Sequence, residues 1–381
     1  MTATPQSTSL VPQEPGGQKQ SSRQRTIILI SRLWAWVFLF GLILFFTLSV
    51  SITSGGEVNF LSLRNSQNIL MAITPVLLMG LGQTFVIIAA GIDLSVGWVM
   101  GLASVVSALV TVDMIARGVS EPAAILIGFG AGLIAALIPG FINGLIIARL
   151  RIPAFIVTLG MSFVARGVAF LLSGGNVVGG QPPGMRLFGN EAPLYFIWGP
   201  NGGLFFFNKP DVTGEALQQM DRIFQWPVVV TAIVVGIAIF VLHRTQFGRH
   251  TYAVGGNREA SLRAGVPVDR HTIKLYMLSA LTAGMAGVLH TARFSGGSSI
   301  AGEPLLLSSI AAVIIGGVSM FGGHGSVVGT IIGALIIAVL TTGLVMLNVQ
   351  PFWQYIVIGI VVILAVLIDQ VRDLVIGRAE S

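Results

Sequence analysis

The few ionisable residues of this chain do not form the sets that hydrolyse nucleotides or perform acid–base catalysis. A P-loop requires Gly-x-x-x-x-Gly-Lys-Ser/Thr, because main-chain N–H groups and the lysine hold the phosphates together. The lysines, Lys19, Lys209 and Lys274, are followed instead by Gln, Pro and Leu. No pair of carboxylates and no Ser/His/Asp set is placed for catalysis. We therefore expect a protein that is not an enzyme and does not itself hydrolyse ATP.

Two charged residues inside apolar stretches are candidates for function. Asp93 lies at a Gly-flanked break, where it either N-caps the following half-helix or contacts a translocation pathway. Arg166 lies about two turns or less from the end of its apolar run. It either lines a polar cavity or reaches the membrane interface. The sequence leaves both pairs of alternatives open.

A basic, Gly-punctuated loop at residues 243–274 separates two long apolar runs. In a membrane protein such a loop stays on the cytoplasmic side. We predict a short helix from Asn257 to Ala264 that is available to a partner protein. The loop carries six bases against Glu259 and Asp269: Arg244, Arg249, Arg258, Arg263, Arg270 and Lys274.

The background that must position these residues is that of a membrane protein. Hydrophobic residues make up 54% of the chain and charged residues only 9%, too few charges to cover a soluble domain of this size. Runs of about 20 apolar residues can cross a bilayer as helices. We predict an all-α polytopic membrane protein with about ten transmembrane helices, some of them broken or re-entrant. The runs are 33–52, 69–90, 94–116, 123–148, 153–172, 227–242, 272–292, 304–320, 325–347 and 352–368.

The absence of cysteine excludes disulfides and thiolate metal sites. We also expect no metal and no cofactor in this chain. Its Lys and Arg residues cluster in particular loops. We interpret them as topology signals, and expect no nucleic-acid partner. With ten spans both termini share a side, and that side holds most of the Lys and Arg residues, which makes both termini cytoplasmic.

These assignments divide the chain into three parts. Residues 1–26 are rich in Ser, Gln, Pro and Thr and are predicted to be a disordered cytoplasmic tail. Residues 27–370 form the transmembrane domain, and 371–381 form a cytoplasmic tail. The loop at 173–226 then faces outward. Its Gly, Pro and aromatic content favours an ordered cap on the membrane surface, a candidate docking surface for an extracytoplasmic partner.

Glycine patterns indicate close helix packing. Small-xxx-small pairs let helix backbones approach within a membrane, and they occur at Gly97/Gly101, Gly140/Gly144 and Gly329/Gly333. Two segments also echo each other: Val-Ile-Ile at 86–88 before the Gly-flanked stretch 91–97, and Val-Ile-Ile at 313–315 before 316–329. Paired Gly-interrupted helices in two halves of a transporter point towards its pathway.

Four motifs in order give the chain a family resemblance. It resembles, from about residue 68 to 369, the permease subunits of ribose-type sugar ABC importers, a branch related to branched-chain amino-acid permeases. The motifs are Gly-Ile-Asp-Leu-Ser-Val-Gly at 91–97; Asn-Gly at 143–144 with Ile-Pro-Ala-Phe-Ile-Val-Thr-Leu-Gly-Met at 152–161 and Arg-Gly at 166–167; Ala-Val-Gly-Gly-Asn at 253–257 with Glu-Ala at 259–260; and Ile-Ala-Ala-Val-Ile-Ile-Gly-Gly at 310–317 through Gly-Gly-His-Gly-Ser at 322–326.

The resemblance implies a division of labour in the bacterial inner (cytoplasmic) membrane. Two permease subunits form the channel, and a periplasmic sugar-binding protein delivers a monosaccharide such as a pentose. We expect a homodimer, while the sequence leaves a paralogous second subunit open. A cytoplasmic ABC ATPase, which binds the ATP and Mg, drives alternating access. The lipid bilayer is the remaining partner.

The motifs give two sets of candidate site residues, and the resemblance carries over by position only Gly256, Asn257, Ala260 and Gly265. This chain has Ser-Leu-Arg-Ala at 261–264 where the family more often has Ala-Arg-Leu-Ser, and the loop 173–226 is longer than is usual. The ATPase-coupling set is Gly255, Gly256, Asn257, Arg258, Glu259, Ala260, Arg263 and Gly265. The translocation-pathway candidates, polar residues near breaks within the motifs, are Gln83, Asp93, Ser95, Asn143, Thr158 and Arg166.

Two alternatives to sugar import remain open on sequence. The same architecture could carry a branched-chain amino acid, a nucleoside or a sugar-like signal molecule. A stand-alone facilitator or ion-coupled carrier is a different class. Ion-coupled carriers bury carboxylates or histidines as relays, and this chain has few such groups in its apolar runs.

Overall fold

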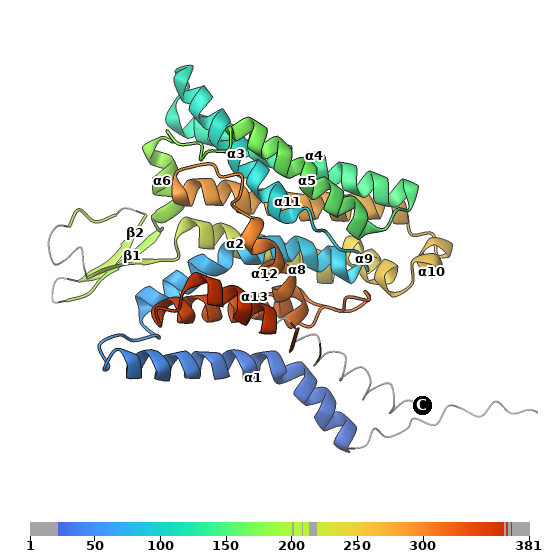
Figure 1. The fold of residues 1–381 in the computed structure, drawn as a ribbon, viewed down its shortest axis with the longest axis horizontal. Helices are drawn as coiled ribbons and strands as arrows, with labels where there is room; N and C mark the ends of the chain where they lie inside the picture. The colour runs from blue at the N-terminus through green and yellow to red at the C-terminus, as the bar shows by residue number, and fades with distance from the viewer. Residues whose placement is uncertain are drawn as a thin grey trace, which may run out of the picture.

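We analysed a computed structural model, which describes residues 22–199, 202–207, 209–212, 219–361, 363–364 and 367. Eight helices in this part are long and apolar enough to span a bilayer, and two shorter apolar helices accompany them (Figure 1). Each of the ten lies on one of the predicted runs. The eight are α1 (Ser22–Thr53), α2 (Leu63–Ile88), α3 (Val96–Ala116), α4 (Glu121–Leu150), α5 (Ala154–Ser173), α8 (Trp226–Arg244), α11 (Val268–Phe294) and α13 (Val327–Met346). The two shorter apolar helices are α12 (Glu303–Ile315) and the helix Pro351–Val361.

The polytopic helical prediction is confirmed, with corrections at its margins. α12 ends at Ile315, five residues before the end of the predicted run, because glycines at 316 and 317 follow. α1 begins at Ser22, so residues 22–26 are helical and do not belong to a disordered tail. Helix-favouring Gln and Arg in this stretch let the apolar helix extend backwards. Residues 1–21 and the predicted tail 371–381 lie outside the described residues.

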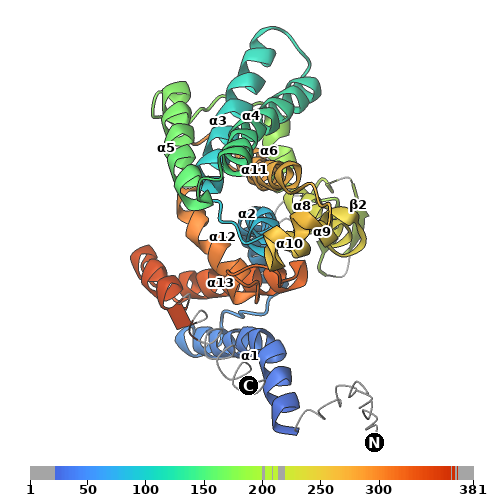
Figure 2. The same ribbon diagram turned by 90° about the vertical axis from the view of Figure 1, so that its right-hand side faces the viewer.

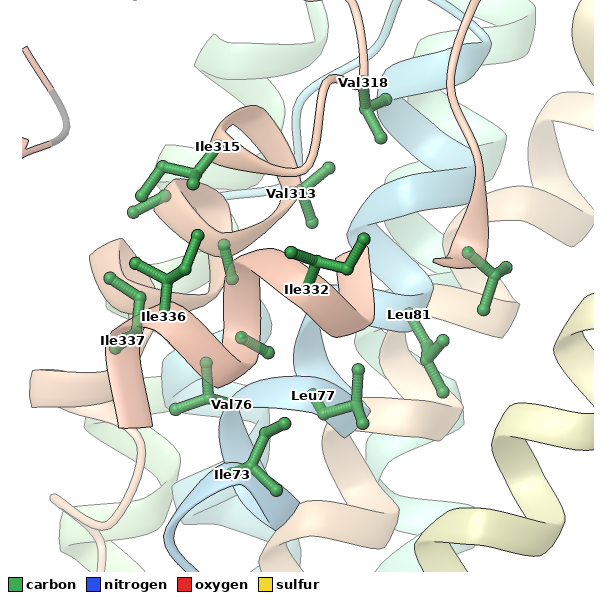
Figure 3. Packing of buried hydrophobic residues seen from close by; sticks show 14 of the residues in the cluster. Ile73, Val76, Leu77, Leu81, Val313, Ile315, Val318, Ile332, Ile336 and Ile337 are labelled. Carbon is green, nitrogen blue, oxygen red and sulfur yellow. The ribbon is translucent and has the colours of Figure 1, made fainter. Parts of the chain in front are cut away.

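The bundle has a buried centre and an apolar periphery. In the most apolar segment of each helix, the buried share of residues is 89% for α2 and 67% for α11. It is only 22–28% for α1, α4, α5 and α8. The peripheral helices therefore present apolar side chains to lipid. In the core, branched side chains of α2 pack against α12 and α13 (Figure 3), among them Ile73, Val76, Leu77, Leu81, Val313, Ile315, Ile332 and Ile336.

The paired glycines lie where a helix touches the main chain of a neighbouring segment. A Cβ on Gly101 of α3 would overlap the carbonyl oxygen of Ser299, and one on Gly329 of α13 would overlap that of Gly316. On α4, Gly144 lies against the main chain of Ile273. These glycines therefore permit backbone contacts that any side chain would block.

Three breaks interrupt the helices. The linker 89–95 joins α2 to α3, the stretch 295–302 joins α11 to α12, and the loop 316–326 joins α12 to α13. The two echoing segments thus occupy equivalent places, each a helix, a break and a helix. The breaks also meet, because the N–H of Gly323 donates to the carbonyl of Ile88 at 2.8 Å.

The first two breaks reach the middle of the bundle. Asp93 in the linker accepts a hydrogen bond from Ser279, which is eleven residues from the start of α11 and fifteen from its end. Ser279 is therefore about 16 Å and 22 Å from the two ends along the axis. Both α3 and α12 begin near this depth, because Gly97 packs directly on the main chain of Gly302. α12 is thus a half-helix, as the prediction of broken helices anticipated.

The described part of the predicted outer loop forms a small subdomain at one end of the bundle, opposite α10 (Figure 1). It contains α6 (Pro183–Asn190) and a three-stranded antiparallel sheet in the order β2-β1-β3. The strands are β1 (Leu194–Ile197), β2 (Gly203–Phe206) and β3 (Met220–Ile223). Tyr195, Ile197 and Met220 form its small core. This sheet was not predicted, and is the exception to an all-α fold in the described part.

Candidate functional site

The break between α2 and α3 holds a fully buried carboxylate. Asp93 is 0% exposed, and one oxygen, Oδ1, accepts from the Ser95 N–H at 3.0 Å and the Ser95 hydroxyl at 2.6 Å. The other, Oδ2, accepts from the Ser279 hydroxyl at 2.8 Å. Asp93 therefore fixes Ser95, the N-cap residue of α3, through an Asx-type turn and bonds no N–H of α3 itself, and it also ties this break to the middle of α11.

Two amides extend the network to α2 and α4. Asn143 Nδ2 donates to the Ser95 hydroxyl at 3.0 Å, and Gln83 Nε2 donates to the main-chain oxygen of Asp93 at 2.5 Å. The amide oxygens of both residues are buried and accept no hydrogen bond among the described residues. A buried acceptor without a donor costs about 1–3 kcal/mol. Each of these two oxygens can therefore accept a hydrogen bond from a donor outside the described side chains.

The remaining pathway candidates lie apart from this network. The Thr158 hydroxyl bonds mainly within α5, to Ala154 at 2.9 Å, and approaches the linker only at the Ile92 carbonyl, at 3.4 Å. Arg166 is on the exposed side of α5, with its guanidinium 4.6 Å from the ring centre of Trp98. The structure thus brings Gln83, Asp93, Ser95 and Asn143 together and leaves Arg166 outside.

The second candidate region is the loop at the other end of the bundle, which folds into two helices (Figure 2). α9 spans Gln246–Gly256 and α10 spans Arg258–Arg263. α10 confirms the predicted helix, whereas α9 was not predicted. Asn257 Oδ1 caps α10 by accepting from the Ala260 N–H at 2.9 Å. Gly265 ends it with φ +81°, and its N–H donates to Leu262 at 3.0 Å, a left-handed termination that favours glycine.

α9 contacts the end of α2 and the loop 316–326. A Cβ on Gly255 would overlap the carbonyl oxygen of Ile88, whereas one on Gly256 would meet nothing within 4 Å. The hydroxyl of Tyr252 donates to the carbonyl of Gly325 at 2.7 Å. Because Gly323 also bonds to Ile88, α9, the end of α2 and the loop 316–326 form one connected unit.

The charged residues of the coupling set remain accessible. Arg263 and Glu259 form an i,i+4 pair at 3.5 Å with side chains 79% and 80% exposed. Arg258 pairs at 3.5 Å with Asp269 at the start of α11, both about half exposed. Pairs this exposed contribute at most about 1 kcal/mol, so a partner can compete for them. The same helix exposes Leu262, at 57%.

Sequence reasoning missed Ser279, Tyr252 and Leu262. Ser279 and Tyr252 act through contacts with residues far along the chain, and no local pattern marks them. Leu262 carried a signal, because it is the one apolar residue of appreciable size in the short polar segment 257–264. No group of three or more potential metal ligands occurs among the residues that the structure describes.

Comparison with known proteins identifies the architecture. The family described as branched-chain amino acid transport system / permease component matches residues 65–366, nearly all of the helical bundle. The chain belongs to this family. It is therefore a multi-pass membrane permease component, which agrees with the absence of a P-loop lysine.

Curated relatives of this permease carry the names of sugar importers. It is 37% identical to the fructose import permease protein FrcC of Rhizobium meliloti, over 83% of this chain and 80% of the relative. It is 35% identical to the ribose import permease protein RbsC of Escherichia coli K12, over 85% of this chain and 91% of the relative. The xylose transport system permease protein XylH of Haemophilus influenzae is 35% identical, over 81% of this chain and 90% of the relative. No solved structure matches this permease.

Proposed function

We propose that this permease is the membrane subunit of an ATP-driven importer that moves a monosaccharide into the cytoplasm by alternating access. The observation that carries the drive mechanism is the connected unit of α9, the end of α2 and the loop 316–326. Relatives named for fructose, ribose and xylose transport support the cargo. The permease sits in the bacterial inner membrane with its α10 end and both termini in the cytoplasm.

The motor is a separate ABC ATPase that binds ATP and Mg and receives α10. The exposed surface of α10 supplies its contacts, with Leu262 at the centre and Arg263 and Glu259 beside it. Closure of the motor subunits displaces α9, and Tyr252 and Gly255 pass that displacement to the breaks. The Asp93 network lies at the far end of the same linker, where α2, α3, α4 and α11 meet.

Two further partners complete the importer. A second copy of this permease forms the other half of the channel, and a periplasmic sugar-binding protein delivers the cargo at the end that carries the sheet. α6 and the three-stranded sheet support the second assignment, because they lie at that end of the bundle (Figure 1).

The test is reconstitution with the ATPase that copurifies from the native membrane. Leu262→Asp places a charge on α10 without touching the Arg258–Asp269 pair, and is expected to release the ATPase. Leu187→Asp is the matched control, because Leu187 is 55% exposed on α6 at the opposite end. ATP-dependent uptake of ribose, fructose or xylose supports the proposal. If only branched-chain amino acids or nucleosides are taken up, the proposed monosaccharide substrate is wrong. If sugar uptake does not require ATP, the proposed ATP-driven mechanism is wrong.

A further inference from the structure

A cavity of about 790 Å³ opens between α12 and the helix Pro351–Val361. This volume falls within the range of about 300–1,000 Å³ that is common for small-molecule sites. Its polar side chains are Glu303, Ser308 and Tyr355, and the rest of its wall is apolar, including Leu307 and Ile358. An apolar wall with a few convergent polar groups is the usual composition of such sites.

The carboxylate in this cavity lies deep in the bundle. Glu303 is the first residue of the half-helix α12, and directly follows Gly302. Gly302 packs on Gly97 at the start of α3, close to the network that joins Asp93 to the middle of α11. Glu303 is therefore at the depth where the bilayer is hydrocarbon.

A carboxylate at this depth needs water, a partner charge or a ligand. Glu303 is exposed on this single chain and has no ion pair within 4 Å among the described residues. The cavity beside it is open, with Leu307 70% and Tyr355 61% exposed. A lipid chain filling it would leave the carboxylate unsolvated, so a polar occupant fits better.

We propose that this cavity is a transient binding site for the transported monosaccharide, with Glu303 as its principal hydrogen-bond acceptor. The inference rests on the proposed function and adds the place where the cargo is held. An ionised carboxylate only accepts hydrogen bonds and makes them strongly, and each sugar hydroxyl has a hydrogen to donate. The hydroxyls of Ser308 and Tyr355 can both donate and accept. The carboxylate of an amino-acid cargo would instead be repelled by Glu303.

The test uses the absence of cysteine from the chain. Leu307→Cys introduces one thiol on the cavity wall, and Ile237→Cys introduces the control on α8, where Ile237 is 57% exposed. Each variant is reconstituted with its partner subunits in lipid and treated with a charged methanethiosulfonate reagent, with and without ribose, fructose and xylose. The reagent is expected to label the thiol at 307 and not the one at 237. The transported sugar should slow labelling at 307.

Glu303→Gln in the same background preserves side-chain size and removes the charge. The sugar concentration for half-protection is expected to rise about tenfold, because charge-assisted hydrogen bonds are the stronger ones. Glu57→Gln, in the exposed turn after α1, should leave it unchanged. The inference is overturned if the thiol at 307 is as unreactive as the thiol at 237, or if a transported sugar does not slow its labelling. It is also overturned if Glu303→Gln does not change the sugar concentration for half-protection. A complex that transports no sugar overturns the proposed function first.

Discussion

The guanidinium of Arg293 on α11 donates a hydrogen bond to the main-chain oxygen of Met71 on α2, at 3.2 Å. Met71 is four residues before Pro75, which lies inside α2 and has no N–H to donate. The arginine thus replaces the helix hydrogen bond that the proline removes. Because Met71 is buried, this contact joins two central helices at the point where α2 lacks one of its helical hydrogen bonds.

This relationship predicts a compensating pair of substitutions. Arg293→Met should lower the free energy of unfolding by about 1–3 kcal/mol, because a buried carbonyl loses its donor. Adding Pro75→Ala restores a helical N–H to Met71, so the double variant should lose less than Arg293→Met alone. Thermal unfolding in detergent compares the two single variants, Arg293→Met and Pro75→Ala, with the double variant. Arg186→Met, at an exposed position of α6, is the control, and strictly additive effects of the two substitutions would contradict the interpretation.

The Asp93 network predicts a difference between two substitutions at one position. Asp93→Asn keeps an oxygen for Ser95 and gains an N–H that can donate to Ser279, so its effect should be small. Asp93→Ala leaves several buried donors without an acceptor and should cost about 2–4 kcal/mol. Asp113→Ala is the control, since Asp113 and Arg117 form an exposed pair. Equal unfolding temperatures for the alanine and asparagine variants at 93 would disprove this role.

Neighbouring glycines provide the sharpest steric test. Gly255→Ala must displace α9 from the end of α2, because the new Cβ would overlap the oxygen of Ile88. Gly256→Ala meets open space and should raise helix propensity slightly. We expect the first to abolish sugar-stimulated ATP hydrolysis in the reconstituted complex and the second to retain it. Comparable activity in both variants would exclude close packing at Gly255.

The Tyr252 hydroxyl predicts a defect in coupling. Burial raises the pKa of Tyr252 above the usual tyrosine value, so its hydroxyl remains a donor at neutral pH. Tyr252→Phe removes the bond to Gly325, worth about 0.5–1.5 kcal/mol, and should lower the sugar transported per ATP hydrolysed by about two- to tenfold.

Tyr195→Phe is the matched control for this substitution. Its hydroxyl is also kept protonated by burial, which raises its pKa, and it donates to Glu191 at 3.0 Å in the sheet subdomain. The transport ratio should stay unchanged in this variant. An equal loss in both would assign the effect at 252 to stability and remove Tyr252 from the coupling unit.

The features that the sequence predicted well are those with a local physical cause. Each apolar run became a helix because its length and composition suit a bilayer. The helix after Asn257 was predictable because a capping side chain precedes it and a glycine follows it. Of the pathway candidates, Gln83, Asp93, Ser95 and Asn143 were grouped by their positions near breaks, and the structure joins them in one network.

The features that were missed depend on distant contacts. Ser279 stands in an ordinary apolar run, and only packing brings it to Asp93. The strands at 194–197 and 203–206 are four residues long, too short for a pattern to separate them from an irregular loop. Arg166 was grouped with the network by its motif, but its guanidinium lies over the ring of Trp98 on α3 instead.

The link from α9 to the helix breaks is made largely by the main chain. The bond from Gly323 to Ile88 uses backbone atoms at both ends, and Tyr252 bonds to a backbone oxygen. Such contacts do not depend on the side chains at the accepting positions. Substitution of cavity side chains such as Glu303 and Ser308 during evolution would therefore change which sugar the proposed site binds. The backbone contacts that link α9 to the helix breaks would stay the same.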